Sequence, residues 1–307
     1  MRRPLLAVAL AALTLTLAAC SSTTPAPDAG GTGTAPIKVV TAFYPLEYLA
    51  EQLGGDQVSV SNLTPPGGEP HDLELTPQQV AEIGDADLVL YIKGFQPAVD
   101  EAVAQQAAHS ALDVSADLSL LPAPHEAVDE APAAGAHDPH VWLDPLNMEA
   151  MGTSVAARLA QIRAEAATSF TKNAASLSRA MTNLDQQWAD GTRSCRSKDL
   201  VVSHEAFGYL AKRYGFTQIG IAGLSPDAEP SPAKVAEVAD FVKAHGISTI
   251  YYESLVDPKI AETVATETGA QATMLDPLEG LVEGSTGNYL SVMQANLAAV
   301  QTGNGCT

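Results

Sequence analysis

Three histidines of this chain lie among turn-forming and acidic residues at nearly even spacing. His71 follows Gly-Glu-Pro, His140 follows Asp-Pro, and His204 precedes Glu-Ala-Phe. Further along, the run Met-Leu-Asp-Pro supplies the carboxylate of Asp276 in a similar setting. Three imidazoles and one carboxylate form a ligand set that suits a four-coordinate zinc ion. The sequence therefore predicts a metal site made by His71, His140, His204 and Asp276.

The elements that must position these residues follow an alternating pattern. Short β-rich runs alternate with longer helical patterns, which is typical of parallel α/β units. The expected strands cover residues 37–42, 58–63, 87–92, 199–203, 218–221, 248–252 and 271–275. The expected helices cover residues 46–53, 76–83, 147–162, 166–189, 207–214, 232–245 and 259–268. An α/β fold of two lobes with parallel-type sheets is the simplest architecture.

The division of the chain follows from the long helical stretch in its middle. We expect an N-terminal lobe over residues 37–165, a rigid linking helix over 166–190 and a C-terminal lobe over 191–307. His71, His204 and Asp276 each come after a predicted strand. Ligands of open α/β sheets bind at the carboxyl ends of strands. We therefore expect the ligands to meet in the cleft between the lobes, two from each half.

The N-terminal segment has the pattern of an export signal. Two arginines precede the apolar run 5–19, which is too short to span a membrane and ends in Leu-Ala-Ala-Cys. Residues 1–20 resemble a bacterial lipoprotein signal peptide, in which the Cys20 thiol takes a diacylglycerol. The alternative is an ordinary secretory signal. Residues 21–36 are rich in Pro, Gly, Ser and Thr and predict a flexible tether.

The composition limits the partners and the redox state. The net charge of −20 argues against nucleic acid and suits attraction of cations. Besides Cys20, the chain has Cys195 and Cys306. In an oxidising compartment such a pair predicts a disulfide, with two free buried thiols as the alternative.

Residues 122–139 interrupt the alternating pattern. The segment is rich in Pro, Ala and acidic residues without periodicity, which predicts a mobile acidic loop. It holds His125 and His137, so a weak auxiliary metal site is the alternative to a solvated loop. The remaining histidines, His109 and His245, lack the local context of the predicted ligands, so a surface role suffices for them.

Four segments together resemble a known family, the zinc- and manganese-binding lipoproteins of bacterial ABC importers. They are residues 65–72, 138–145, 203–209 and 275–278, and the likeness runs from about residue 37 to the C-terminus. The resemblance implies two α/β lobes, a long linking helix and a metal held in the cleft between the lobes. It also implies that His71, His140, His204 and Asp276 are the ligands.

The third ligand indicates which metal is bound. Manganese-type members of this family tend to carry glutamate where this chain has His204. Nitrogen ligands favour zinc and oxygen ligands suit manganese, so zinc is expected, with manganese or another divalent metal as the alternative. Glu205, next to His204, is a second candidate for the carboxylate ligand.

Metal-bound histidines usually donate their other ring N–H to a carboxylate or a carbonyl. Asp72, Asp144 and Glu253 are candidates for this supporting role. Asp144 has an equally good alternative, which is to cap the helix expected from residue 147.

The predicted function is capture of Zn²⁺ outside the cell and its delivery to an ABC permease with a cytoplasmic ATPase. We expect a monomeric, lipid-anchored binding protein that is not an enzyme. A zinc hydrolase is the main rival, but it needs an open metal position for water. The run His-Glu-Ala-Phe-Gly also lacks the second histidine of the His-Glu-x-x-His motif, because Gly208 stands there. An adhesin role stays open.

Overall fold

The computed structural model describes residues 35–123 and 136–307. The predicted signal peptide with Cys20, most of the predicted tether and the middle of the segment 122–139 lie outside these residues. The membrane anchor therefore remains a prediction. Within the described ranges, no helix combines the length and the apolar character needed to cross a membrane.

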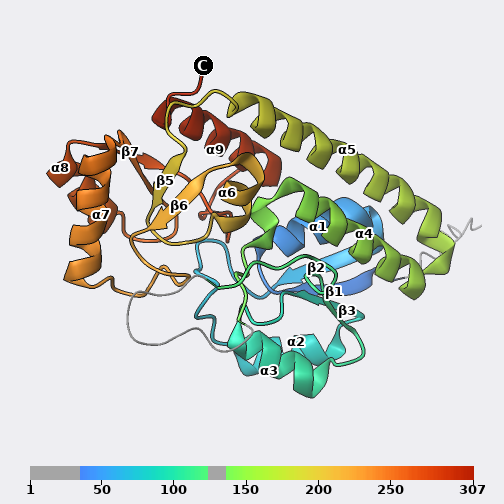
Figure 1. Ribbon diagram of the computed structural model, residues 1–307. Coiled ribbons are helices and arrows are strands. Elements are labelled where there is room, and N and C mark those ends of the chain that lie inside the picture. Colours follow the sequence, from blue (N-terminus) through green and yellow to red (C-terminus); the bar gives the residue numbers. More distant parts are fainter. Residues whose placement is uncertain (1–34, 124–135) are drawn as a thin grey trace, which may run out of the picture. The chain divides into compact units, whose positions relative to one another are not determined.

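The first half of the chain forms a four-stranded parallel sheet (Figure 1). Its strand order is β2-β1-β3-β4, and β1 pairs with β2 from Ile37 opposite Val58. The strands are β1 (Ile37–Thr41), β2 (Val58–Asn62), β3 (Leu88–Tyr91) and β4 (Ala111–Asp113). The helices between them are α1 (Tyr44–Gly54), α2 (Pro77–Asp85) and α3 (Pro97–Gln106), and the short 3-10 helix η1 (Gly55–Gln57) precedes β2.

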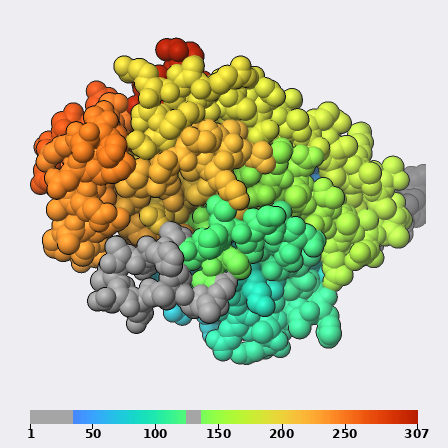
Figure 2. Space-filling view, in the orientation of Figure 1, coloured from blue at the N-terminus to red at the C-terminus, as the bar shows by residue number. Residues whose placement is uncertain are grey.

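The second half repeats this architecture with another four-stranded parallel sheet in the order β6-β5-β7-β8. The strands are β5 (Asp199–Val202), β6 (Thr217–Gly220), β7 (Thr249–Tyr252) and β8 (Gln271–Met274). The helices are α6 (Gly208–Tyr214), α7 (Pro232–His245), α8 (Lys259–Thr268) and α9 (Tyr289–Gly303). In the space-filling view, the orange surface belongs to the α7 and α8 region and lies apart from the teal surface of the α2 and α3 region (Figure 2).

Two long helices, α4 and α5, connect the two halves of the chain. After the short 3-10 helix η2 (Val141–Leu143), α4 (Pro145–Ile162) leads through η3 (Ala164–Ala166) into α5 (Ala167–Gly191). Helix α5 packs against α4 and α1 of the first half and against α9 of the second half. The boundaries that we expect for the two lobes and the linking helix stay a prediction.

Residue alternation in the strands explains how each sheet is covered on both faces. In β5, Leu200 and Val202 belong to the large core that also contains residues of the first half. Val201, which points to the opposite face, belongs to a separate cluster with residues of α7 and α8. Strands that are buried on both faces read as continuous apolar runs.

The structure confirms the predicted fold class of two α/β lobes with parallel sheets. The sequence pattern did not predict β4, α3 and α9. Strand β4 has only three residues. Helix α3 has weak amphipathic character, since only three of its ten residues are buried. Both signals are too weak for a pattern based on apolar periodicity.

The predicted disulfide is also confirmed. Cys195 and Cys306 are joined, 111 residues apart in the sequence. The bond connects the C-terminal end, just after α9, to the segment that precedes β5. It therefore fixes the last helix against the start of the second sheet.

The contact between α4 and α5 depends on a residue without a side chain. A Cβ built on Gly152 would lie 2.4 Å from Cδ2 of Leu177, whereas a Cβ on Gly84 of α2 would meet no atom closer than 3.7 Å. We predict that Gly152→Val lowers the free energy of unfolding by about 1–3 kcal/mol through overpacking. Gly84→Ala should change it by at most about 1 kcal/mol, in the stabilising direction. Urea unfolding of both variants measures the difference, and equal stabilities would contradict this account of the contact.

Candidate metal centre

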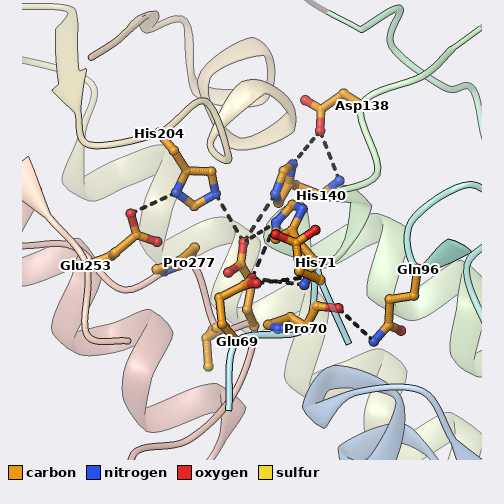
Figure 3. A network of polar contacts seen from close by, with 12 residues as sticks. Glu69, Pro70, His71, Gln96, Asp138, His140, His204, Glu253 and Pro277 are labelled. Atoms are coloured by element: carbon orange, nitrogen blue, oxygen red, sulfur yellow. Dashed lines mark hydrogen bonds and ion pairs between the residues drawn. The ribbon is translucent and has the colours of Figure 1, made fainter. Parts of the chain in front are cut away.

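Four side chains from distant parts of the chain converge on one point. They are His71, His140, His204 and Glu279, and all four are buried. Oε1 of Glu279 lies 3.2 Å from Nε2 of His71 and of His140, and 3.1 Å from Nε2 of His204. Figure 3 shows the three rings turned toward a common carboxylate, with His204 on the opposite side from His71 and His140. Among the described residues, this is the one group of at least three possible ligands that contains histidine.

The spacing of these atoms fits a small tetrahedral ion. Zinc binds imidazole nitrogen and carboxylate oxygen at about 2.0–2.2 Å, so neighbouring ligand atoms in a tetrahedron lie about 3.3–3.5 Å apart. The nitrogen-to-oxygen distances of 3.1–3.2 Å are close to that value. Small shifts of the rings would open the centre enough for an ion.

His71 is held in place by the loop between β2 and α2. Its backbone N–H donates to Oε1 of Glu69 at 2.9 Å. The carbonyl of the preceding Pro70 accepts a hydrogen bond from Nε2 of Gln96 at 3.0 Å. The ring packs edge-on against Phe95, with ring centroids 4.7 Å apart. The loop is therefore fixed to the start of α3 immediately before the histidine.

His140 is oriented by a carboxylate two residues before it. Oδ1 of Asp138 lies 2.8 Å from Nδ1 of His140 and accepts the backbone N–H of His140 at 2.9 Å. The carbonyl of Asp138 accepts the hydroxyl of Tyr209 from α6 at 2.9 Å. An imidazole that offers Nε2 to a metal carries its proton on Nδ1, which is the atom that faces Asp138. This role of Asp138 was not predicted from the sequence, although Asp138 stands in the same Asp-Pro-His run as His140.

His204 has the same arrangement. It follows β5 after one residue, and its Nδ1 lies 2.9 Å from Oε1 of Glu253, which follows β7 directly. The same oxygen accepts the hydroxyl of Ser203 at 2.6 Å. Glu253, one of the three acids expected to support a ligand, thus lies where that role requires it.

The carboxylate among the imidazoles belongs to Glu279, whereas Asp276 was expected there. Oδ1 of Asp276 accepts the backbone N–H of Leu278 at 2.7 Å, so it closes its own turn. Leu278 then adopts a left-handed backbone conformation with φ of 59°, which is rare for a residue with a branched side chain. Asn296 of α9 braces the turn by bonding the backbone N–H and the carbonyl of Asp276 at 2.9 and 2.7 Å. The turn therefore directs the carboxylate of Glu279, three residues later, into the cluster.

The other expected residues lie elsewhere. The carboxylate of Asp144 accepts the N–H of Leu146 at the start of α4 and pairs with Arg213, so it caps the helix. Asp72 is exposed and forms a second acidic group with Glu69 and Asp227. Glu205, the rival carboxylate, is not among the four clustered residues.

Burial and electrostatic interactions within the cluster shift the pKa values of its four side chains. Burial would raise the pKa of Glu279, but the three imidazoles outweigh it and hold the pKa well below its usual range. Burial opposes the charge on His204, yet Glu279 and Glu253 raise its pKa to about 10. Burial likewise opposes the charge on His140, while Asp138 and Glu279 raise its pKa. Burial is the main cause that lowers the pKa of His71.

A glycine at the start of α6 makes room for the support of His140. A Cβ built on Gly208 would lie 2.5 Å from Oδ2 of Asp138. Any larger residue there would push the Asp138 carboxylate away from the ring that it orients. The glycine that excluded the His-Glu-x-x-His motif thus has a packing role in this site.

The fold and the site define a class: a binding protein with two parallel α/β lobes and a buried cluster of metal-ligand side chains drawn from both. The chain belongs to the ZnuA family, described as zinc-uptake complex component A, periplasmic, whose family model matches residues 39–303.

Relatives with assigned names agree with this membership. The high-affinity zinc uptake system protein ZnuA of Bacillus subtilis is 33% identical over 305 residues, which cover 95% of each chain. The zinc-binding lipoprotein AdcA of Streptococcus pneumoniae is 35% identical over 277 residues, which cover 86% of this chain and 55% of AdcA. This chain therefore spans about half the length of AdcA.

Solved structures show the same fold. The Zn(II)-bound ZnuA-like domain of S. pneumoniae AdcA is 34% identical with a TM-score of 0.75, covering 88% of this chain and 99% of that domain. The laminin-binding protein Lmb of Streptococcus agalactiae, described as bifunctional with adhesin and metal transporting activity, is 32% identical with a TM-score of 0.78. That match covers 87% of this chain and 99% of Lmb.

The contact between Gly208 and Asp138 generates a prediction. Gly208→Ala should weaken Zn²⁺ binding by about 10- to 100-fold, the usual effect of losing a hydrogen-bond partner of a ligand. Competition with a chromogenic chelator measures the affinity, and circular dichroism checks that the variant is folded. Gly84→Ala, which meets no close atom, is the matched control. Unchanged affinity in folded Gly208→Ala would show that the position of Asp138 does not matter.

Proposed function

We propose that this protein captures Zn²⁺ outside the cytoplasm and delivers it to an ABC permease for import. The ligands of the ion are His71, His140, His204 and Glu279. The observation that carries the proposal is the position of Oε1 of Glu279, 3.1–3.2 Å from Nε2 of all three imidazoles. The names of the relatives, zinc uptake system protein and zinc-binding lipoprotein, support the same function.

The chemistry of the ligands favours zinc over manganese. Three imidazole nitrogens and a single carboxylate suit Zn²⁺, whereas Mn²⁺ prefers more oxygen ligands. Two further carboxylates, from Asp138 and Glu253, hydrogen-bond the far sides of His140 and His204. They increase the basicity of these imidazoles and compensate the charge of the dication in a buried site.

A closed ligand set distinguishes a carrier from an enzyme. Catalytic zinc sites keep one position open for water, while four protein ligands fill a tetrahedron. With Glu279 as the fourth ligand, no position is left for an attacking water. The protein therefore binds its ion as cargo and catalyses no hydrolysis.

The family and the N-terminal sequence support the proposed location and partners. Residues 1–20 act as a lipoprotein signal, and the lipid on Cys20 holds the monomeric protein at the outer face of the membrane. Residues 21–36 tether the binding body there. The permease, coupled to its cytoplasmic ATPase, receives the ion. The acidic composition, with 36 Asp and Glu against 16 Lys and Arg, favours cations as cargo.

Metal analysis of the protein, after chelation and competitive reloading with Zn²⁺ and Mn²⁺, tests this function. We expect one zinc per chain. Glu279→Gln should weaken zinc binding by about 100-fold or more, because the anionic ligand is lost. Asp276→Asn is the matched control and should weaken it by less than about tenfold, since asparagine can still close the turn. A larger loss of zinc affinity in Asp276→Asn than in Glu279→Gln would identify Asp276 as the ligand. Preferential loading of manganese would reject the zinc assignment.

The pH dependence of binding has a definite sign. With a pKa of about 10, His204 carries a proton at neutral pH in the metal-free site. Zinc requires the neutral imidazole, so binding must displace that proton. The apparent affinity should therefore weaken as the pH falls from 8 to 6, by about tenfold per unit for each displaced proton.

Calorimetry in buffers of different ionisation enthalpy measures the number of protons released. His109→Gln, which changes an exposed histidine, should leave both the release and the affinity unchanged. Equal zinc affinity at pH 8 and pH 5 would contradict this ligand set.

A further inference from the structure

The second sheet carries a pocket that the proposed metal centre does not use. Its volume is about 320 Å³, at the lower end of the range for small-molecule sites. Ser203, Ile221 and Glu253, which directly follow β5, β6 and β7, line its inner part. The start of α8 and the loop before α7 form the remaining walls.

The topology of the sheet favours a ligand at this place. Strand β6 lies on one side of β5, and the chain then crosses over to place β7 on the other side. In open α/β sheets, ligands bind outside the carboxyl ends of the strands where the strand order reverses. The pocket lies at this switch point, because the residues that directly follow β5, β6 and β7 line it.

The charge of the residues that line the pocket favours a positively charged ligand. Four acidic residues line the pocket, and no lysine or arginine does: Asp227, Glu229, Glu253 and Asp257. Within the described ranges, only Asp257 among them pairs with a lysine, the exposed Lys259 just outside the lining. The side chain of Glu253 is the buried member, with a residue exposure of 3%. Its Oε1 accepts the hydroxyl of Ser203 and faces His204, but its Oε2 is buried without a hydrogen-bond partner among the described residues. A buried carboxylate oxygen is stabilised when a donor, above all a charged one, reaches it.

The rest of the lining favours an organic cation over a metal ion. Alanine, proline, valine and isoleucine side chains make up most of the wall, including three prolines that stiffen it. Within the part of the chain that the structure describes, Glu253 belongs to no group of three or more possible metal ligands. Asp227 is the one described lining residue that does, and its two partners, Glu69 and Asp72, lie outside the lining. Apolar walls with one buried carboxylate suit an aliphatic chain that ends in a positive group.

We propose that this pocket binds a primary aliphatic ammonium ion and that its occupancy weakens metal binding. The coupling runs through Glu253, which lines the pocket and whose Oε1 lies 2.9 Å from Nδ1 of His204. An ammonium group in the pocket attracts the negative charge of this carboxylate, which then supports the imidazole of His204 less well. The positive charges of the two ligands also repel one another. By linkage, zinc weakens the binding of the ammonium ion by the same factor.

The first experiment tests the pocket on the metal-free protein, independently of the zinc assignment. The probe is n-butylammonium chloride, observed by saturation-transfer NMR at pH 7, with n-butanol at matched ionic strength as the neutral control. We expect saturable binding of the ammonium ion and much weaker binding of the alcohol. Equal binding of the two probes, or no binding of either, would overturn the proposal.

Variants locate the binding. Ala228 is an exposed residue of the lining, and Ala228→Trp should fill the pocket and abolish binding of n-butylammonium. Glu229→Gln should weaken it severalfold. Glu267→Gln, which removes an exposed acid of α8 outside the lining, is the matched control and should have no effect. Binding that survives Ala228→Trp would place the ligand elsewhere and reject the pocket.

The second experiment tests the coupling and rests on the proposed zinc site. Saturating n-butylammonium should raise the Kd for Zn²⁺ by about fivefold or more in the unaltered protein and leave it unchanged in Ala228→Trp. An unchanged Kd while the ammonium ion is bound would disprove the coupling. If the protein took up no zinc at all, the proposed function would fail, and the first experiment would still decide whether the pocket binds its ligand.

Discussion

One carboxylate oxygen joins side chains from the two halves of the chain at the candidate metal centre. Oε1 of Glu279 lies within 3.1–3.2 Å of three imidazole nitrogens from both halves of the chain. Bringing three imidazoles together in a buried place is unfavourable when they carry protons, because like charges repel and burial penalises each of them. The single anionic oxygen that they share offsets part of this cost, and the imidazoles in turn hold the pKa of Glu279 well below its usual range.

The hydrogen bonds that hold the cluster in place link the two halves of the chain. The segment with His140 is held from the second half at several points. Nε1 of Trp142 donates to the carbonyl of Pro277 at 2.7 Å, and the hydroxyl of Tyr289 donates to the carbonyl of Trp142 at 2.7 Å. Tyr209 adds its bond to Asp138. The turn that carries Glu279 and the segment that carries His140 are thus joined directly, and these ligands keep their spacing as a unit.

The sequence predicted the histidines because each stands among turn-forming or acidic residues next to a strand or helix signal. For the carboxylate it pointed to Asp276, with Glu205 as the alternative, and not to Glu279, which lies three residues after Asp276 in the same short loop. The choice depends on the left-handed conformation of Leu278 and on the bonds from Asn296, twenty residues later. Neither is readable from local periodicity. Asp138 was overlooked for a related reason: aspartate before proline also predicts a turn, and only the position of the folded ring shows its second role.

Helix α9 has a consequence for the order of events in the cell. It supplies Asn296, which braces the turn before Glu279, and Tyr289, which reaches the segment of His140. The disulfide between Cys195 and Cys306 fastens the end of this helix to the start of the second sheet. A chain that is synthesised from its N-terminus therefore contains all three histidines of the cluster before Tyr289 and Asn296 are added. The four side chains can therefore reach their observed spacing only after this last helix has docked.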